Sequence, residues 1–419
     1  MIRKRIQQLI HQFRQNTFFT FLNLFGISIT IMVIMVGTIQ VDNKFNPGGP
    51  ESNNDKHLYL TRMKYKNDDN GVMIGGLNLE IIENYLLKTK SAKATAFTAK
   101  QPWNHIDPYD VKEYTVRYTN AGFWTVYDFR FIAGKGYTKE DVEASLPYVV
   151  ISESISRKFF NSPHEAVGKT IVIFDKNYTV TGVTKDVSPT CTFSHAQAWM
   201  PYTLRSNIWE SIENTGAYEV TFYVEDKNQA AMLKEEANNI EQQVSQQLSD
   251  WTVVFGGPYT ALDNYFQGYG DPERYDGSTL NVLSLLFNAF LVMLIPAINL
   301  VSLNLTRMHE RSEEIAIRKS FGASRGRLIR QLLTENGILS VAGALLGFGL
   351  AILVTAMFKE KIFLSPWDTV SGEIQFRVQG LSILICIVMT FILNLLSGLI
   401  PALKLSKLAP AKILKGGEL

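Results

Sequence analysis

The chain has 419 residues, and its 41 basic and 39 acidic side chains leave a formal net charge of +2. This length is enough for two or three domains. The near-neutral charge gives no indication of nucleic-acid binding, and the basic residues that cluster lie beside apolar segments, where they suit a membrane surface. The 6 histidines are scattered and the 2 cysteines lie in segments of opposite character, so the sequence indicates neither a metal site nor a disulfide.

The N-terminal part predicts a surface helix followed by a membrane span. Residues 1–16 combine basic side chains with apolar residues at helical spacing, which is typical of an amphipathic helix on the cytoplasmic surface. Residues 17–40 are uncharged and long enough to cross a bilayer. This apolar core is too long for a cleaved signal peptide and no small-residue cleavage site follows it, so we expect an uncleaved anchor.

Residues 41–278 are polar and predict a large extracytoplasmic domain that starts with a Pro- and Gly-rich linker. Hydrophobic periodicity predicts two strand–helix–strand units that together form an α/β lobe. Their elements are expected at 57–65, 78–89 and 92–99, and again at 218–224, 228–248 and 251–255.

The stretch between these two units, at about 106–214, predicts an inserted β-rich lobe. Its strands are expected at 114–118, 148–151, 170–174 and 178–183, with a short helix at 152–160. Gly168-Lys169-Thr170 is not a phosphate-binding loop, because Pro163 stands where the first glycine is required and a strand is expected where a helix should follow. No other stretch resembles a nucleotide site.

Three further apolar segments predict three more spans, at 279–305, 328–358 and 380–403. They are separated by a basic loop at 306–327 and an outer loop at 359–379, and a lysine-rich tail follows at 404–419. The positions of the basic residues predict that both termini lie in the cytoplasm. Gly343 and Gly347 form a small-residue face in the third span and are expected to allow close helix packing.

The basic loop carries its own helix signals. Ser312 is a capping residue with acidic residues directly after it, while Arg318 and Lys319 come toward the other end and Gly322 can stop the helix. This order predicts a short cytoplasmic helix along the membrane. An ordinary loop whose positive charge only fixes the orientation of the spans is the alternative interpretation.

Residues 314–325, EIAIRKSFGASR, resemble the signature cytoplasmic loop of the FtsX/MacB-type ABC transporter permease family. Residues 123–186 resemble the MacB-like periplasmic core domain of that family, and the tail from Pro401 onward resembles its ending in part. The resemblance and the segments above together predict an α-helical membrane protein with four transmembrane helices, arranged 1+3. Its large extracytoplasmic α+β domain is split into an α/β lobe and an inserted β-rich lobe.

The resemblance also implies partners and a site. In the family this loop is a coupling helix that docks on a separate ATPase, so ATP is bound by the partner and this chain needs no cofactor. Carried over by position, the coupling residues are Glu313, Glu314, Ile315, Ile317, Arg318, Lys319, Gly322 and Ala323.

Family members pair as homo- or heterodimers in the bacterial inner membrane and pass ATP-driven motion to the extracytoplasmic domain, a mechanism called mechanotransmission. The resemblance thus implies a permease subunit for efflux or export, with membrane lipid around it and a periplasmic adaptor or another extracytoplasmic protein as a further partner.

Two other functions stay open from the sequence. Within the family, the alternative is an FtsX-like or lipoprotein-release-type regulator that acts on an extracytoplasmic protein. Outside it, the alternative is a ligand-binding receptor, for which a larger cytoplasmic output domain would be expected. A membrane enzyme would need a nucleophile–base or metal-ligand set, and the sequence indicates none.

Overall fold

The computed structural model describes most residues between Thr17 and Leu395. The described residues are 17–69, 71–107, 110–205, 214–248, 250–267, 270–274, 283–284, 287–288, 291, 298, 317, 320–321, 323–364, 373–380, 382–392 and 395. The chain divides into two compact units. A helical unit comprises Met1–Asp42, Val282–Ile362 and Val378–Leu419, and an α/β unit comprises Asn43–Asn281 and Phe363–Arg377.

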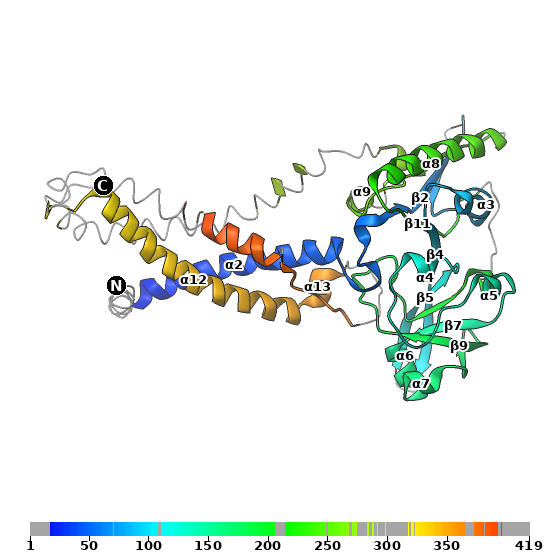
Figure 1. The fold of residues 1–419 in the computed structure, drawn as a ribbon, viewed down its shortest axis with the longest axis horizontal. Helices are drawn as coiled ribbons and strands as arrows, with labels where there is room; N and C mark the ends of the chain where they lie inside the picture. The colour runs from blue at the N-terminus through cyan, green and yellow to red at the C-terminus, as the bar shows by residue number, and fades with distance from the viewer. Residues whose placement is uncertain are drawn as a thin grey trace. The chain divides into compact units, whose positions relative to one another are not determined.

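The helical unit contains the long helices α2 (Thr17–Phe45) and α12 (Arg325–Met357), followed by the short α13 (Lys359–Phe363) (Figure 1). Among the described residues, two helical stretches are long and apolar enough to cross a membrane, Leu24–Phe45 and Gly337–Met357. They coincide with the first and third expected spans. The second expected span lies almost wholly outside the described residues. Part of the fourth is seen as a shorter apolar helix, Ser382–Ile392.

The α/β unit is built on a nine-stranded sheet with the order β1-β11-β4-β5-β10-β7-β9-β6, in which β8 pairs with β9. The bounds of its strands are β1 His57–Leu60, β4 Ala94–Asp107, β5 Asp110–Thr119, β6 Phe131–Gly134, β7 Tyr148–Ser152, β8 Thr170–Ile173, β9 Lys176–Thr184, β10 Ala198–Pro201 and β11 Glu219–Tyr223. The strands expected in the inserted lobe are confirmed as β5, β7, β8 and β9.

A second sheet has the order β12-β2-β3, with β2 Arg62–Lys66, β3 Val72–Gly75 and β12 Thr252–Gly256. Figure 1 shows α8 and α3 toward one end of the unit and α6 and α7 toward the other. The helices are α3 Leu79–Asn84, α4 Phe123–Val126, α5 Lys139–Glu143, α6 Glu153–Phe160, α7 Pro163–Ala166, α8 Lys227–Gln247 and α9 Ala261–Gln267; the 3-10 turns are η1 Gly49–Glu51, η2 Asn54–Lys56, η3 Leu86–Lys88, η4 Tyr202–Leu204 and η5 Pro272–Arg274.

Two expectations about strand connections need correction. The single strand expected at 57–65 is two strands, because the chain leaves the large sheet after β1 and enters the small sheet as β2. The first strand–helix–strand unit holds, since β1 and β4 both pair antiparallel with β11 and are therefore parallel to each other. The second does not form within one sheet, because β12 pairs with β2. Hydrophobic periodicity identifies strands but does not say which strand will be the neighbour.

The large sheet is covered on both faces. Residues alternate between faces along each strand, so Val149 and Ile151 pack into one apolar cluster while Val150 packs into another. The first face carries the clusters of the α/β lobe and of the inserted lobe, which adjoin where Ala99 is paired with Tyr118. The second face carries the aromatic cluster around Trp199.

The segment at 46–55 is not an open linker. It forms the turns η1 and η2, and Pro50, Glu51 and Asn54 are buried there. A composition rich in Gly, Pro and Asn predicts turns correctly, but it does not tell whether the turns are packed against a sheet.

Candidate functional site

Most of the predicted coupling residues lie outside the described part of the chain: Glu313, Glu314, Ile315, Arg318, Lys319 and Gly322. Of the described ones, Ile317 is helical with 48% of its surface exposed, and its carbonyl accepts a hydrogen bond from the Phe321 amide at 3.1 Å. Phe321 itself is 88% exposed and Ala323 is half-buried.

Gly343 and Gly347 face α2. A Cβ atom added to Gly343 would lie 2.4 Å from Cγ2 of Ile27, and one added to Gly347 would lie 2.6 Å from the carbonyl oxygen of Ser28. Gly349, on the same helix, has open space around it. The two small residues therefore let α12 and α2 approach closely within one chain.

The C-terminal turns of α2 also bind α13 and the start of the last apolar helix. Within the helical unit, Gln40 Nε2 donates to the carbonyl of Ile362 at 2.7 Å, and Ser382 Oγ donates to Asp42 Oδ2 at 2.7 Å. Neither contact is apparent from the sequence, because the paired residues lie more than 300 positions apart.

Residues 373–377, between α13 and the last apolar helix, belong to the α/β unit and are fastened to it by two side chains. The fully buried Asn43 donates from Nδ2 to the carbonyl of Arg377 and accepts from its amide at Oδ1, at 2.7 and 2.8 Å. Ser188 Oγ likewise donates to the carbonyl of Gln375 and accepts from its amide, each at 3.2 Å. Each side chain thus satisfies both backbone groups of one residue, as a neighbouring strand would.

Ser188 lies in the β9–β10 loop (residues 185–197), which covers the second face of the large sheet. Although the loop contains no helix or strand, Cys191, Ser194, His195 and several neighbours are buried. Loops usually stay at the surface because buried backbone groups need hydrogen-bond partners. The two ends of this loop pair with backbone groups, Lys185 with Arg130 and Gln197 with Thr115, and buried side chains supply further partners for its middle.

Glu51 supplies a hydrogen-bond acceptor for the amides in the middle of this loop. Its Oε1 accepts from the amides of Phe193 and Ser194 at 2.8 Å each, and from Ser194 Oγ at 2.9 Å. The residue is only 2% exposed. Burial raises the pKa of this carboxyl group, while the three donors act in the opposite direction. Glu51 thereby joins the end of η1, a few residues beyond α2, to the middle of the loop.

Arg117 on β5 supplies hydrogen-bond donors for two carbonyls of this loop. Nε donates to the carbonyl of His195 at 2.8 Å and Nη2 to that of Thr192 at 2.5 Å. The side chain has no exposed surface, and Nη1 lies 3.8 Å from Oε2 of Glu219. Burial lowers the pKa of the guanidinium group. The planar fork of Arg can satisfy two carbonyls at once, which explains why the loop can lie flat on the sheet.

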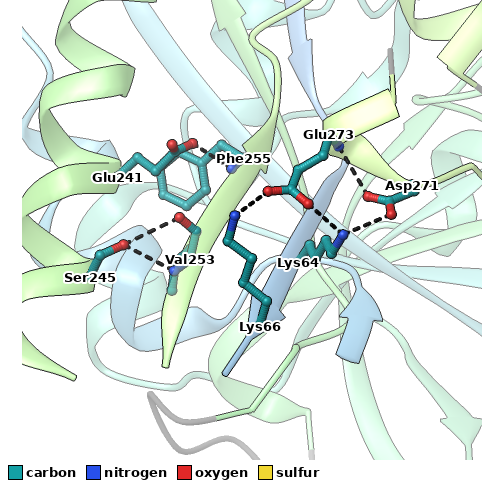
Figure 2. Close-up of polar contacts among 8 residues, drawn as sticks. All are labelled: Lys64, Lys66, Glu241, Ser245, Val253, Phe255, Asp271 and Glu273. Atoms are coloured by element: carbon teal, nitrogen blue, oxygen red, sulfur yellow. Dashed lines mark hydrogen bonds and ion pairs between the residues drawn. The ribbon is translucent and has the colours of Figure 1, made fainter. Parts of the chain in front are cut away.

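A second charged cluster fastens the segment at 271–274 to the small sheet. Figure 2 shows the amine of Lys64 between two carboxylates, Asp271 Oδ2 at 2.7 Å and Glu273 Oε2 at 2.6 Å, with Lys66 on the other oxygen of Glu273. The hydrogen bond to Asp271 is the largest cause of a raised pKa at Lys64, and the bond from Lys64 is the largest cause of a lowered pKa at Glu273.

These clusters hold segments together and have no arrangement for chemistry. Among the described residues, no group of three or more His, Cys, Asp or Glu side chains is placed to hold a metal ion. Sequence reasoning missed Glu51, Arg117 and Ser188. The only available signal was a charged residue in the centre of the strand TVRYT, and that pattern normally indicates a solvent-facing side chain.

Two family models match the chain. The MacB-like periplasmic core domain matches residues 20–240, and the FtsX-like permease C-terminal domain matches residues 286–410. Among curated proteins, the chain is similar to the macrolide export ATP-binding/permease protein MacB of Neisseria meningitidis, with 25% identity over 292 residues, which is 69% of this chain and 41% of that protein.

The chain is also similar to the ABC transporter permease YknZ of Bacillus subtilis, with 24% identity over 306 residues, or 72% of this chain and 70% of that one. A third relative is the pyoverdine export ATP-binding/permease protein PvdT of Pseudomonas syringae, with 24% identity over 237 residues, 55% of this chain and 33% of that protein. Among solved structures, the periplasmic region of MacB from Actinobacillus actinomycetemcomitans matches with a TM-score of 0.33 and 16% identity, covering 46% of this chain and 88% of that one. The chain spans less than half the length of the MacB relatives that it matches.

Proposed function

Because the chain belongs to the FtsX/MacB-type family of ABC transporter permeases, we propose that it is a non-catalytic permease subunit that passes the ATP-driven motion of a separate ATPase to its extracytoplasmic domain. The observation that carries this proposal is the order of the two family matches. A periplasmic core domain is followed by a permease domain that contains the coupling segment. The motion serves efflux or export of a substrate, as the names of MacB and PvdT indicate for those proteins.

In this mechanism the ATPase contacts the cytoplasmic helix at 313–324, and the rigid helices beside it carry the motion outward. A second copy of the permease completes the assembly, since two ATPase subunits that close on each other need two such helices. The proposed ATPase contact is made by Glu314 and Arg318, whose charges are opposite and which lie four positions apart in the sequence, a spacing that would place them on one face of the expected helix.

The test is charge reversal in this helix. The variants Glu314→Lys and Arg318→Glu, co-expressed with the ATPase, are expected to lose co-purification with the ATPase and the stimulation of its ATP hydrolysis. Glu360→Lys on α13 is the matched control, because Glu360 is exposed and the change in charge is the same as in Glu314→Lys. Its complex is expected to stay intact. If both coupling variants retain the ATPase and its stimulated activity, the proposed function is wrong.

A further inference from the structure

The β9–β10 loop is the place where two of the chain's membrane connections meet the large sheet. Glu51 follows α2 and binds the loop at Phe193 and Ser194, while Gln375 lies in the segment after α13 and binds it at Ser188. All of these residues belong to the α/β unit. The loop therefore receives a contact from each of two chain segments that lead to apolar helices.

The loop passes these contacts on to the sheet through buried groups. Arg117 on β5 holds two of its carbonyls, and Trp199 on β10 donates from Nε1 to the carbonyl of Ser194 at 3.1 Å. Gln197 accepts at Oε1 from the Thr115 amide at 2.7 Å. Strands β5 and β10 are direct neighbours in the centre of the nine-stranded sheet. Each of these side chains is buried, so a displacement of the loop that broke their hydrogen bonds would cost much free energy.

The loop also packs tightly against β1 and the turn before η1. Phe193 stacks on Tyr59 of β1 with 4.1 Å between the ring centroids, and Cys191 Sγ lies 3.5 Å from the carbonyl oxygen of Gly48. Close packing of this kind moves as a body and does not deform gradually. The contacts thus form one connected path from η1 and the 373–377 segment to the sheet.

We propose that the β9–β10 loop is the coupling element through which movement of the membrane helices reaches the nine-stranded sheet, with Ser188 and Glu51 as positioning residues. This inference rests on the proposed function and specifies the route by which the extracytoplasmic domain is moved. The test measures whether the two ends of this path respond together.

Ser188→Ala is the decisive variant, because it removes the two hydrogen bonds to Gln375 and little volume. It also removes the bonds that Ser188 Oγ accepts within the loop from the amide and the hydroxyl of Thr190. The chain offers a matched control in Ser245 on α8, whose Oγ donates to the carbonyl of Val253 at 3.2 Å and accepts from its amide at 2.9 Å (Figure 2). Ser245→Ala therefore removes the same pair of bonds at a site outside the path. Thr190→Val is a second control, because it removes only the hydroxyl bond from Thr190 to Ser188 within the loop.

The experiment compares hydrogen–deuterium exchange in the full chain bound to its ATPase, without nucleotide and with MgATP and orthovanadate. In the wild type and both controls, trapping the nucleotide is expected to change the exchange of β5 and β10. In Ser188→Ala the change in exchange is expected to be at most about one fifth of the wild-type change. ATPase binding and the unfolding temperature of this variant are expected to match those of Ser245→Ala.

Each other outcome overturns a defined statement. An undiminished response of β5 and β10 in Ser188→Ala overturns the role of the loop and leaves the proposed function standing. An equal loss of the response in Ser245→Ala also overturns it, because the effect would then not depend on the path. A wild-type domain that does not respond to the trapped nucleotide at all overturns the proposed function, and the role of the loop with it.

Discussion

Arg117 and Lys64 are both cations with almost no exposed side chain, at 0% and 7%, yet their partners differ. Arg117 is held by neutral backbone carbonyls of the β9–β10 loop, and its nearest carboxylate is 3.8 Å away. Lys64 is held by two carboxylates that are themselves 21% and 34% exposed. The first arrangement supplies hydrogen-bond donors to the backbone of a buried loop, while the second pairs a lysine with two partly exposed carboxylates. The loss of Arg117 should therefore affect stability and its salt dependence differently from the loss of Lys64.

The largest effect is expected from Arg117→Ala. It leaves the carbonyls of Thr192 and His195 without donors and should lower the free energy of unfolding by about 3–5 kcal/mol. Arg117→Lys should recover only part of this, because a single ammonium group cannot reproduce the fork. Denaturant unfolding of the full chain in detergent, followed by tryptophan fluorescence, measures both. A loss below about 1 kcal/mol in Arg117→Ala would show that the loop does not depend on this residue.

The next effect is a dependence on pH. Burial lowers the pKa of His57 to about 4 and that of His195 to about 3, from an ordinary value of 6.5. The unfolded chain therefore binds more protons below pH 6.5. The stability from the neutral imidazoles is complete above that value and is lost as the pH falls. At pH 5 the loss is about 2 kcal/mol for each histidine.

Glu51 acts in the opposite direction. Burial raises its folded pKa above the usual 4.5, so its protonation adds stability as the pH falls through the raised value. Glu51→Gln removes this contribution and keeps an oxygen acceptor. Unfolding midpoints at pH 7, 6 and 5 should accordingly fall more steeply in Glu51→Gln than in the wild type. A midpoint that is independent of pH in both proteins would contradict the burial of the two neutral histidines.

A smaller effect is expected from Lys64→Met, about 1–2 kcal/mol, because Asp271 and Glu273 can turn toward water once the amine is gone. Since the two carboxylates are partly exposed, the difference from the wild type should shrink in about 0.5 M salt. The stability difference between Arg117→Ala and the wild type should not shrink in salt. Unfolding of both variants at low and high salt measures this. Equal salt sensitivity of the two variants would remove the distinction drawn between the clusters.

The smallest effect is expected from Lys66→Ala. Its side chain is 43% exposed and forms an ion pair with Glu273. Such surface pairs contribute less than about 1 kcal/mol. The same unfolding assay should place this variant within about 0.5 kcal/mol of the wild type. A loss as large as that of Lys64→Met would mean that the cluster acts as one network.

Much of the fold follows from local pattern. The strands β5, β7, β8 and β9, the helix α6 and the long apolar helices α2 and α12 were predicted close to their observed positions, because alternation and helical periodicity are properties of short windows. The coupling role of 313–323 stays a prediction from the family resemblance, since most of these residues lie outside the described part of the chain.

The sequence by itself determined the order of the chain: a span, a large polar domain, further apolar segments, and a basic loop with the family's signature. Only the tertiary structure decided that β12 joins the small sheet, and that Glu51, Ser188 and Arg117 hold one buried loop. These residues are separated by many positions in the chain. Which buried polar group satisfies which backbone group depends on distance in space, and no local pattern carries that information.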